Sequence, residues 1–210
     1  FSVDRRKQNS VLYVFESNKN EEYWASYNAE TDDFTKQFLG ENPIKGSYDE
    51  NTAASKYKTN IQLYTKTAII NLEKPLISIV SDTIIASERK VTLRIESLRN
   101  ANKVELLTKT PIQFKLFMVN DEPLKNDINS KYSFSAERGT IMNFYLTDKD
   151  EILEIKFVVD KNQVIDIDIL EAKYDLFTNP QFSIIPRTEI MMPMPFVLND
   201  ATVIKTNIKF

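Results

Sequence analysis

The amino-acid sequence predicts a mainly β protein: an antiparallel β-sandwich with an N-terminal hairpin–helix–strand module. Three observations lead to this fold class. The 13 Phe and 9 Tyr residues, together with many Ile and Val, favour strands. From residue 76 onward, short apolar stretches recur about every 8–14 residues between polar turns, as they do in sandwiches. Only one stretch has the period of an amphipathic helix, which disfavours a sheet of β–α–β units.

The chain has 210 residues, of which 42% are hydrophobic, and this is enough to form a real core. Pro75 is a natural boundary between elements. We therefore expect residues 1–75 to form the N-terminal module and residues 76–210 to form the sandwich. The two parts could also form one continuous domain.

The N-terminal module begins with a predicted β-hairpin over residues 10–28. The stretch "VLYVF" is apolar and β-rich, "SNKNEE" supplies turn residues, and Tyr23–Trp24 restarts a strand. The period then changes in "AETDDFTKQFLGENP", where Phe34 and Phe38 lie four residues apart. Thr31 or Asp32 can cap a helix there and Gly40 can end it, so one short helix is expected.

A polar loop over residues 46–60 and a strand over residues 61–72 complete the predicted module. In the sandwich, the alternation around residues 91–95 predicts a half-buried strand. Asn120–Asp121 is expected to form a hairpin turn. Since the whole chain has 3 glycines, Asn and Asp must occupy most of the left-handed turn positions.

Two further strands carry predictions about their faces. In "IQFKLFMVN", regular alternation would place Phe114, Leu116 and Met118 on one face. In "EILEIKFVV", Ile152 and Phe157 would point to opposite faces, which predicts that both faces of that strand are covered.

The composition argues against several classes of function. The chain contains neither His nor Cys, which excludes disulfides, thiol chemistry, Ser–His pairs and the usual zinc ligands. The net charge is −3, with both signs mixed along the chain, so nucleic acid is not an expected partner. No apolar run is long enough to span a membrane. The sequence begins at Phe1 without an initiator Met, which suggests a piece of a longer protein.

Acidic residues gather at two places. In "DIDILEAKYD", Asp166 and Asp168 should share one face of a strand. A calcium site would also need a Gly-bearing loop, which is absent, so we interpret this face as solvated. Residues 30–33, "ETDD", could bind a cation, but they also suit the start of a helix. An enzyme using a carboxylate pair would need two acids facing each other across a cleft.

Tyr23, Trp24 and Tyr27 are candidates for an aromatic platform that stacks on a sugar or a peptide. Neighbouring residues of a strand point to opposite sides, so Tyr23 and Trp24 cannot both face the same ligand. The alternative is that these rings belong to the core. We expect Trp24 to be largely buried against the helix near Phe34 and Phe38.

The stretch "EIMMPMPF", residues 189–196, is unusually rich in Met and Pro. Its prolines cannot donate hydrogen bonds, which forbids a central strand. We expect an extended strap across the sandwich, anchored by Phe196 and one or two methionines, with the remaining methionines in an apolar patch. The candidate docking residues are Met191, Met192, Met194 and Phe196.

Three stretches together resemble one protein family. The stretch "NSVLYVFESNKNEEYWASYNAETDDFTKQFLGENP" resembles the start of the C-terminal domain of multi-pass membrane peptidases of family M28, which are similar to vacuolar membrane proteases and endoplasmic-reticulum metallopeptidases. The matching residues are Tyr13, Trp24, Ala25, Ser26, Phe34, Thr35, Phe38 and Gly40.

The later stretches extend the resemblance over nearly the whole chain. "RKVTLRIESLRNANKVEL" and "FMVNDEPL" resemble the sandwich part of that domain, with Asp121 in place of the family's Gly. "PRTEIMMPMPFVLNDATVIKTNIKF" resembles its end, with Thr188 in place of a Pro.

The resemblance implies a non-catalytic accessory domain. In the family, zinc is bound by a separate upstream peptidase domain, so this chain is expected to carry no cofactor and no catalytic residue. Its partners would be its own upstream peptidase domain and transmembrane bundle. The implied location is the extracytoplasmic side of a membrane, here a bacterial periplasm, with the anchor in the upstream part. An independent β-sandwich module that binds carbohydrate or peptide remains the alternative.

Overall fold

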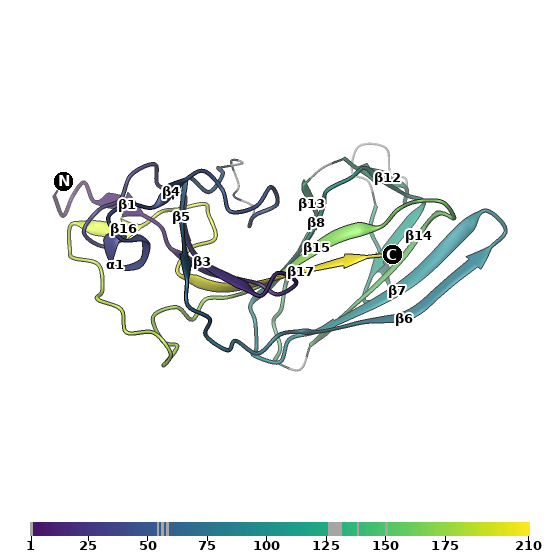
Figure 1. Cartoon of the computed structure of the whole chain (residues 1–210). Coiled ribbons are helices and arrows are strands. Elements are labelled where there is room, and N and C mark those ends of the chain that lie inside the picture. The colour runs from purple at the N-terminus through teal and green to yellow at the C-terminus, as the bar shows by residue number, and fades with distance from the viewer. Residues whose placement is uncertain are drawn as a thin grey trace. The chain divides into compact units, whose positions relative to one another are not determined.

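The structure is a computed structural model that describes residues 2–53, 55, 57, 59–125, 132–137, 139–149 and 151–210. The chain is mainly β, with one helical turn and several antiparallel sheets (Figure 1), and the predicted fold class is confirmed. No helix among the described residues is long and apolar enough to cross a membrane.

The chain divides into two compact units. Unit 1 comprises residues 1–72 and 172–206, and unit 2 comprises residues 73–171 and 207–210. All of residues 76–210 were expected to form the sandwich, but residues 172–206 belong to unit 1.

Unit 1 contains five neighbouring strands of a larger sheet, a helical turn and a separate two-stranded ribbon. The sheet order is β17 (Ala201–Lys209), β2 (Leu12–Glu16), β3 (Glu21–Ser26), β5 (Leu63–Thr67) and β4 (Ile44–Lys45). The helical turn is α1 (Lys36–Leu39), and the ribbon pairs β1 (Lys7–Asn9) with β16 (Met191–Pro193) in parallel. Strand β17 lies parallel to β2, while β2, β3 and β5 are antiparallel.

The predicted hairpin over residues 10–28 is confirmed as β2 and β3, joined by a turn with a positive φ at Asn20. The helix is shorter than the period suggested. The segment before it forms a turn, in which Asp32 accepts a hydrogen bond from the Thr35 N–H at 2.9 Å. Gly40 ends the helix with φ 72°, as predicted. Asp32 therefore accepts hydrogen bonds within the turn before the helix and does not cap a longer helix.

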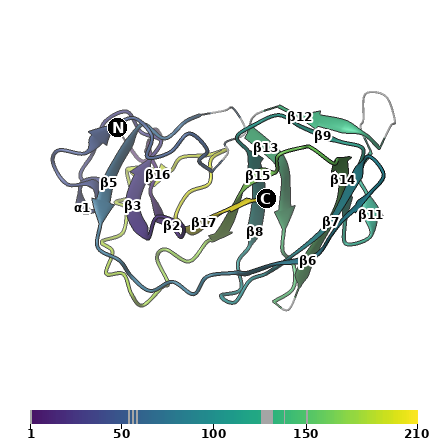
Figure 2. The ribbon, with the colours of Figure 1, turned by 45° about the vertical axis from the view of Figure 1, so that its right-hand side comes forward.

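Unit 2 is a sandwich of two sheets around one core (Figure 2). One sheet has the order β11 (Glu122–Pro123), β10 (Leu116–Val119), β14 (Ile152–Asp160), β7 (Glu88–Glu96) and β6 (Leu76–Ile85). The other contains β13 (Gly139–Tyr145), β8 (Lys103–Thr108) and β15 (Asp166–Lys173) in that order. A small ribbon pairs β9 (Ile112–Phe114) with β12 (Phe134–Ala136).

The alternation predicted for residues 91–95 is confirmed, since Val91, Leu93 and Ile95 are all buried in the core of unit 2. Asn120 and Asp121 both have positive φ at the β10–β11 turn, also as predicted. Asn and Asp supply five of the seven non-glycine positions with positive φ among the described residues: Asn20, Ala86, Asn100, Asn120, Asp121, Phe196 and Asp200.

Two predictions about faces were wrong. The strand is interrupted at Lys115: β9 ends before this residue and pairs with β12, whereas β10 begins after it and pairs with β14. This break moves Phe117 rather than Leu116 into the core beside Phe114. In β14, Leu153 and Phe157 are buried while Ile152 is exposed, so this strand buries one face only.

Candidate docking surface

An aromatic cluster lies at the centre of unit 1. The Trp24 ring is half-buried and packs against Tyr13 at 4.9 Å, Phe38 at 4.8 Å and Phe182 at 5.3 Å between ring centroids. Phe34 packs edge-on against Phe38 at 5.4 Å. The expected packing of Trp24 against the helix is therefore present, although its ring is less buried than expected because it lies at the edge of this cluster.

The stretch rich in Met and Pro is an extended segment, as expected, but it packs on this aromatic cluster in unit 1 and not across the sandwich of unit 2. We call residues 182–196 the strap. Its strand β16 runs parallel to β1, and the Met194 N–H donates to the Asn9 carbonyl at 2.7 Å. Met191 packs against the aromatic cluster. Met192 and Met194 are half-buried. An edge ribbon tolerates the prolines because their missing N–H groups are not needed there.

Phe196 does not anchor the strap. Its side chain is 58% exposed and contacts the Tyr57 ring at 5.4 Å. Pro195 followed by a positive φ of 63° at Phe196 is the pattern of a type II turn, which displays its corner residue. Leu198, two residues later, is the buried apolar residue of this region.

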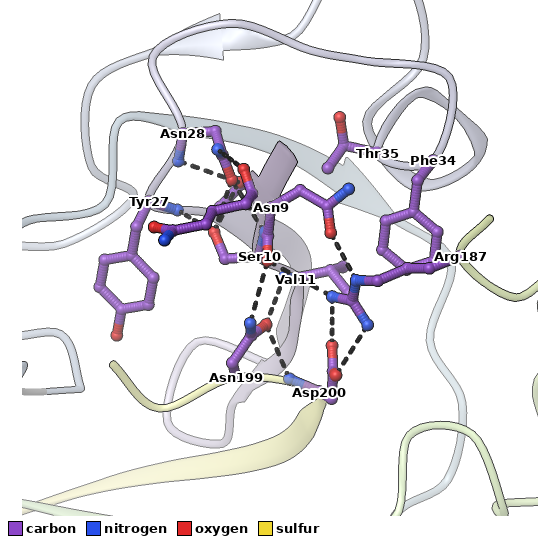
Figure 3. A network of polar contacts seen from close by, with 12 residues as sticks. Asn9, Ser10, Val11, Tyr27, Asn28, Phe34, Thr35, Arg187, Asn199 and Asp200 are labelled. Atoms are coloured by element: carbon purple, nitrogen blue, oxygen red, sulfur yellow. Dashed lines mark hydrogen bonds and ion pairs between the residues drawn. The ribbon is translucent and has the colours of Figure 1, made fainter. Parts of the chain in front are cut away.

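Arg187 holds the strap in place (Figure 3). Its guanidinium makes two hydrogen bonds to the Asp200 carboxylate, at 2.8 and 2.7 Å. It also donates to the Asn9 side-chain oxygen and lies 4.2 Å above the Phe34 ring centroid. The Arg187 side chain is 9% exposed. A paired charge, an amide acceptor and an aromatic face together satisfy this nearly buried cation.

Two asparagines extend this network into the sheet (Figure 3). The Asn199 side-chain oxygen accepts hydrogen bonds from the Val11 and Asp200 N–H groups, both at 2.9 Å. The Asn28 side-chain oxygen accepts hydrogen bonds from the Ser10 N–H at 2.8 Å and the Ser10 hydroxyl at 2.9 Å. These amides accept hydrogen bonds from the backbone N–H groups that directly precede β2.

The strap and the segment before it expose several large apolar side chains. Ile185 is 73% exposed, yet its backbone N–H and C=O are both hydrogen-bonded to the Gln37 side chain, at 2.9 and 3.0 Å. The exposed apolar side chains here are Phe177, Ile185, Ile190 and Phe196, and we call this set the strap surface. Ile185 is held by Gln37, and the Ile190 carbonyl accepts a hydrogen bond from the Lys7 N–H at 2.8 Å, so these two side chains stand on an ordered backbone.

A pocket of about 140 Å³ lies beside the strap surface. It is lined by Asp33, Phe34, Gln37, Ile185, Pro186, Thr188 and Met191. Its walls are mostly apolar, and its volume suits one or two side chains of a partner rather than a whole ligand, since ligand pockets are usually about 300–1,000 Å³.

The three candidate platform aromatics do not share an exposed surface. Tyr23 is 8% exposed and stacks on Tyr48 at 5.3 Å. Tyr27 is 3% exposed and donates its hydroxyl to the Ala53 carbonyl at 3.0 Å. Trp24 lies on the other face of β3 from Tyr23, in the aromatic cluster. All three rings contribute to the interior of unit 1.

Glu22 is a buried carboxyl that sequence reasoning did not single out. Its Oε2 accepts hydrogen bonds from the Tyr13 hydroxyl and from the Ile70 N–H, the latter at 2.7 Å. Burial raises the pKa of Glu22 to about 7, and the Ile70 hydrogen bond only partly opposes this effect. At neutral pH, this group titrates inside the fold.

A second buried polar group is centred on Lys205. Its ammonium lies 2.7 Å from Asp49 and 3.2 Å from Glu16, and it donates to the Asn51 carbonyl. Burial raises the pKa of Glu16, because it outweighs the attraction of Lys205. At Asp49, burial is outweighed by hydrogen bonds from Lys205, Asn51 and Lys19, so the pKa is lowered. This group attaches the loop around residue 49 to β17.

The acidic candidates are engaged with internal partners. Asp168 is fully buried, contrary to the solvated face that was expected, and it contacts Lys109 at 3.5 Å and Asn207 at 2.9 Å. Asp166 pairs with Lys209 and Asn207. The described part of the chain places no group of three or more His, Cys, Asp or Glu residues where they could hold a metal ion.

In comparisons with known proteins, no protein-family model, curated protein or solved structure matches the chain.

Replacing Glu22 by Gln is expected to change how stability depends on pH. The unfolded chain releases this proton near the ordinary pKa of 4.5, whereas the folded chain holds it up to about 7. The free energy of unfolding should therefore fall as pH rises through this window, by about 3 kcal/mol. The amide of the variant has no proton to lose. Urea unfolding at pH 4.5 and pH 8 should show the variant gaining up to about 3 kcal/mol over the wild type at the higher pH.

The matched control for this experiment is Glu30→Gln, which removes an exposed carboxyl. Its stability difference from the wild type should be nearly the same at both pH values. A Glu22→Gln variant whose difference is equally constant would contradict the description of Glu22 as a buried acid whose pKa is raised to about 7.

Replacing Arg187 by Ala should destabilise unit 1 and loosen the strap. The change leaves the partly buried Asp200 carboxylate without its cation, and the cost should fall somewhat below the roughly 3–5 kcal/mol of a fully buried pair. Urea unfolding measures the loss, and limited proteolysis should show earlier cleavage within residues 182–196. Arg94→Ala removes an exposed arginine that pairs with Glu154 and should cost less than about 1 kcal/mol. Equal effects of the two changes would refute the role given to Arg187.

Proposed function

We propose that this chain is a non-catalytic extracytoplasmic accessory domain of a membrane-anchored zinc aminopeptidase-like protein of family M28. In this proposal it docks on its own upstream peptidase domain or transmembrane bundle through the strap surface. The resemblance of three stretches to that family motivates the class of protein. Zinc would belong to the upstream peptidase domain, and the chain would support that domain or the access of its substrate on the periplasmic side of a bacterial membrane.

The observation that carries the docking role is the strap surface. Ile185, Ile190 and Phe196 are 73%, 41% and 58% exposed. Each large apolar side chain left in water forgoes roughly 1.5–3 kcal/mol of burial. The network around Arg187 holds the strap against the sheet, which lowers the entropy that a partner must remove on binding. Several exposed large apolar side chains along one short segment suit an interaction site.

The alternative carbohydrate- or peptide-binding module has less support. It depended on Tyr23, Trp24 and Tyr27 forming a stacking surface. Tyr23 and Tyr27 are buried, and Trp24 is enclosed by other rings. Accordingly, the proposal assigns these aromatic residues to the interior and the docking role to the strap surface.

The test uses the chain and the upstream part of the same reading frame as separately purified proteins. Replacing Ile185, Ile190 and Phe196 together by Ser should weaken their association at least tenfold, about 1.4 kcal/mol, as measured by titration calorimetry. The stability of the chain should change little because these side chains are already exposed.

The control is Ile44→Ser combined with Ile69→Ser, which removes two other exposed apolar side chains of unit 1. This control should bind like the wild type. Unchanged affinity of the triple variant would refute docking through the strap surface. A reading frame that encodes neither upstream membrane spans nor a zinc peptidase domain would refute the class of protein itself.

A further inference from the structure

Strand β6 is a long, exposed edge of the five-stranded sheet in unit 2. It has 10 residues, and among the described strands β7 is its only neighbour in that sheet. Figure 1 shows it as the outer strand of the long β6–β7 hairpin. Its exposed apolar side chains are Leu76 at 55%, Ile79 at 45%, Val80 at 53%, Ile84 at 61% and Ile85 at 60%.

This edge lacks proline, lysine and short length, three of the devices by which proteins keep an open edge from pairing with other chains. The opposite edge of the same sheet is protected in this way: β11 has 2 residues, and one of them is Pro123. Strand β6 has no proline and no lysine. Its single charge, Asp82, is bound by Arg89 at 2.6 Å.

The sequence of β6 is complementary to itself when it is read in the opposite direction. In an antiparallel pairing of two copies centred between Val80 and Ser81, apolar residues meet apolar residues at both ends and Ser78 meets Thr83 inside them. The cross-strand pairs are Leu76 with Ile85, Ile77 with Ile84, Ser78 with Thr83, Ile79 with Asp82 and Val80 with Ser81. The outer three pairs are of the kinds that stabilise sheets, and the inner two join an apolar residue to a polar one.

A β-bulge in the middle of β6 makes this register geometrically possible. A two-fold axis perpendicular to a sheet keeps each side chain on its own face, so the two residues of a pair must lie on the same face. In a regular strand, residues 77 and 84 would point to opposite faces. The register against β7 shifts between Ile79 and Ser81, leaving Val80 as the extra residue.

Because of that shift, the two halves of β6 match. Ile77 pairs with Ile95, and Ile84 pairs with Arg89, so both lie on the core-facing side of the sheet. Ser78 and Thr83 pair with Arg94 and Lys90, and both lie on the other side. Every pair of the self-complementary register apart from the central one therefore has its two residues on one face.

We propose that two copies of this chain associate through β6, which joins their five-stranded sheets edge to edge in an antiparallel two-fold dimer. The pairing would satisfy the open backbone groups of β6. It would bury Ile77 against Ile84 of the second copy on the core-facing side and Leu76 against Ile85 of the second copy on the other. This association is independent of the strap surface, which lies in unit 1.

Cysteine cross-linking tests the register directly, since the chain has no native cysteine. Ser78→Cys and Thr83→Cys are prepared as two separate proteins. In the dimer, residue 78 of one copy lies about 5 Å from residue 83 of the other, between Cβ atoms. Residue 78 lies roughly 16 Å from residue 78 of the second copy, because five residues separate them along the strand.

Oxidation of the mixed proteins should therefore give a covalent dimer containing one chain of each kind, while each protein alone should give little. Equal cross-linking in the separate and mixed samples would overturn the register, and so would no cross-linking in any sample. Multi-angle light scattering of the unmodified chain should show dimers that dissociate on dilution. A monomer at every concentration would overturn the proposal.

The lysine variant Ile79→Lys/Ile84→Lys places charges along the edge and should make the chain monomeric, with at least a tenfold weaker dimer. Both positions are exposed in the single chain, so circular dichroism should show an unchanged fold. Val164→Lys, at another exposed apolar position of unit 2, is the matched control and should remain dimeric. Dimers that persist in the double lysine variant would overturn the proposal.

Discussion

The pairing of Arg187 with Asp200 is the interaction on which the organisation of unit 1 depends. Residues 172–206 follow the whole of the sandwich in sequence, yet they return to the first 72 residues. The chain arrives by an extended strap and leaves by β17. Arg187 lies between the two, bound to Asp200 and stacked on Phe34. Since a nearly buried cation is costly without its partners, the strap has one favourable position.

The consequences extend into the sheet and onto the surface. Asp200 leads directly into β17, which then pairs in parallel with β2 and carries Lys205 to Glu16 and Asp49. On the other side of Arg187, two hydrogen bonds with the Gln37 side chain fix the backbone of Ile185 while its own side chain remains in water. The same constraint that completes the sheet therefore also orders the proposed docking surface. Unit 2 shows a different solution, in which one apolar core between two sheets holds the strands together.

Features set by neighbouring residues were predictable from the sequence. The β2–β3 hairpin, the alternation at Val91 and Leu93, and the Asn120–Asp121 turn all follow from local pattern and turn chemistry. The break at Lys115 did not follow, because it arises when β9 and β10 pair with different strands far away in the sequence.

The burial of individual polar groups could not be predicted from the local sequence pattern either. Asp168 has the same spacing as a solvated strand residue, and only its contacts with Lys109 and Asn207 reveal that it is buried. The candidate site was predicted in part. The stretch around Met191 forms an extended strap, but in unit 1 rather than across the sandwich. Nothing in the local sequence pattern pointed to Arg187 and Asp200 as the pair that holds it. Phe196 looked like an anchor by its size, whereas the turn after Pro195 directs it outward.

Hydrogen exchange of the wild-type chain tests this account most directly. The Val11, Met194 and Asp200 N–H groups donate to Asn199, Asn9 and Val11 respectively, outside any regular sheet ladder. If the Arg187 network holds the strap, these amides should exchange as slowly as those of β2 and β3, by opening of the whole unit. Exchange of the three amides much faster than that of β2 and β3 would show that the strap detaches on its own and would contradict the account.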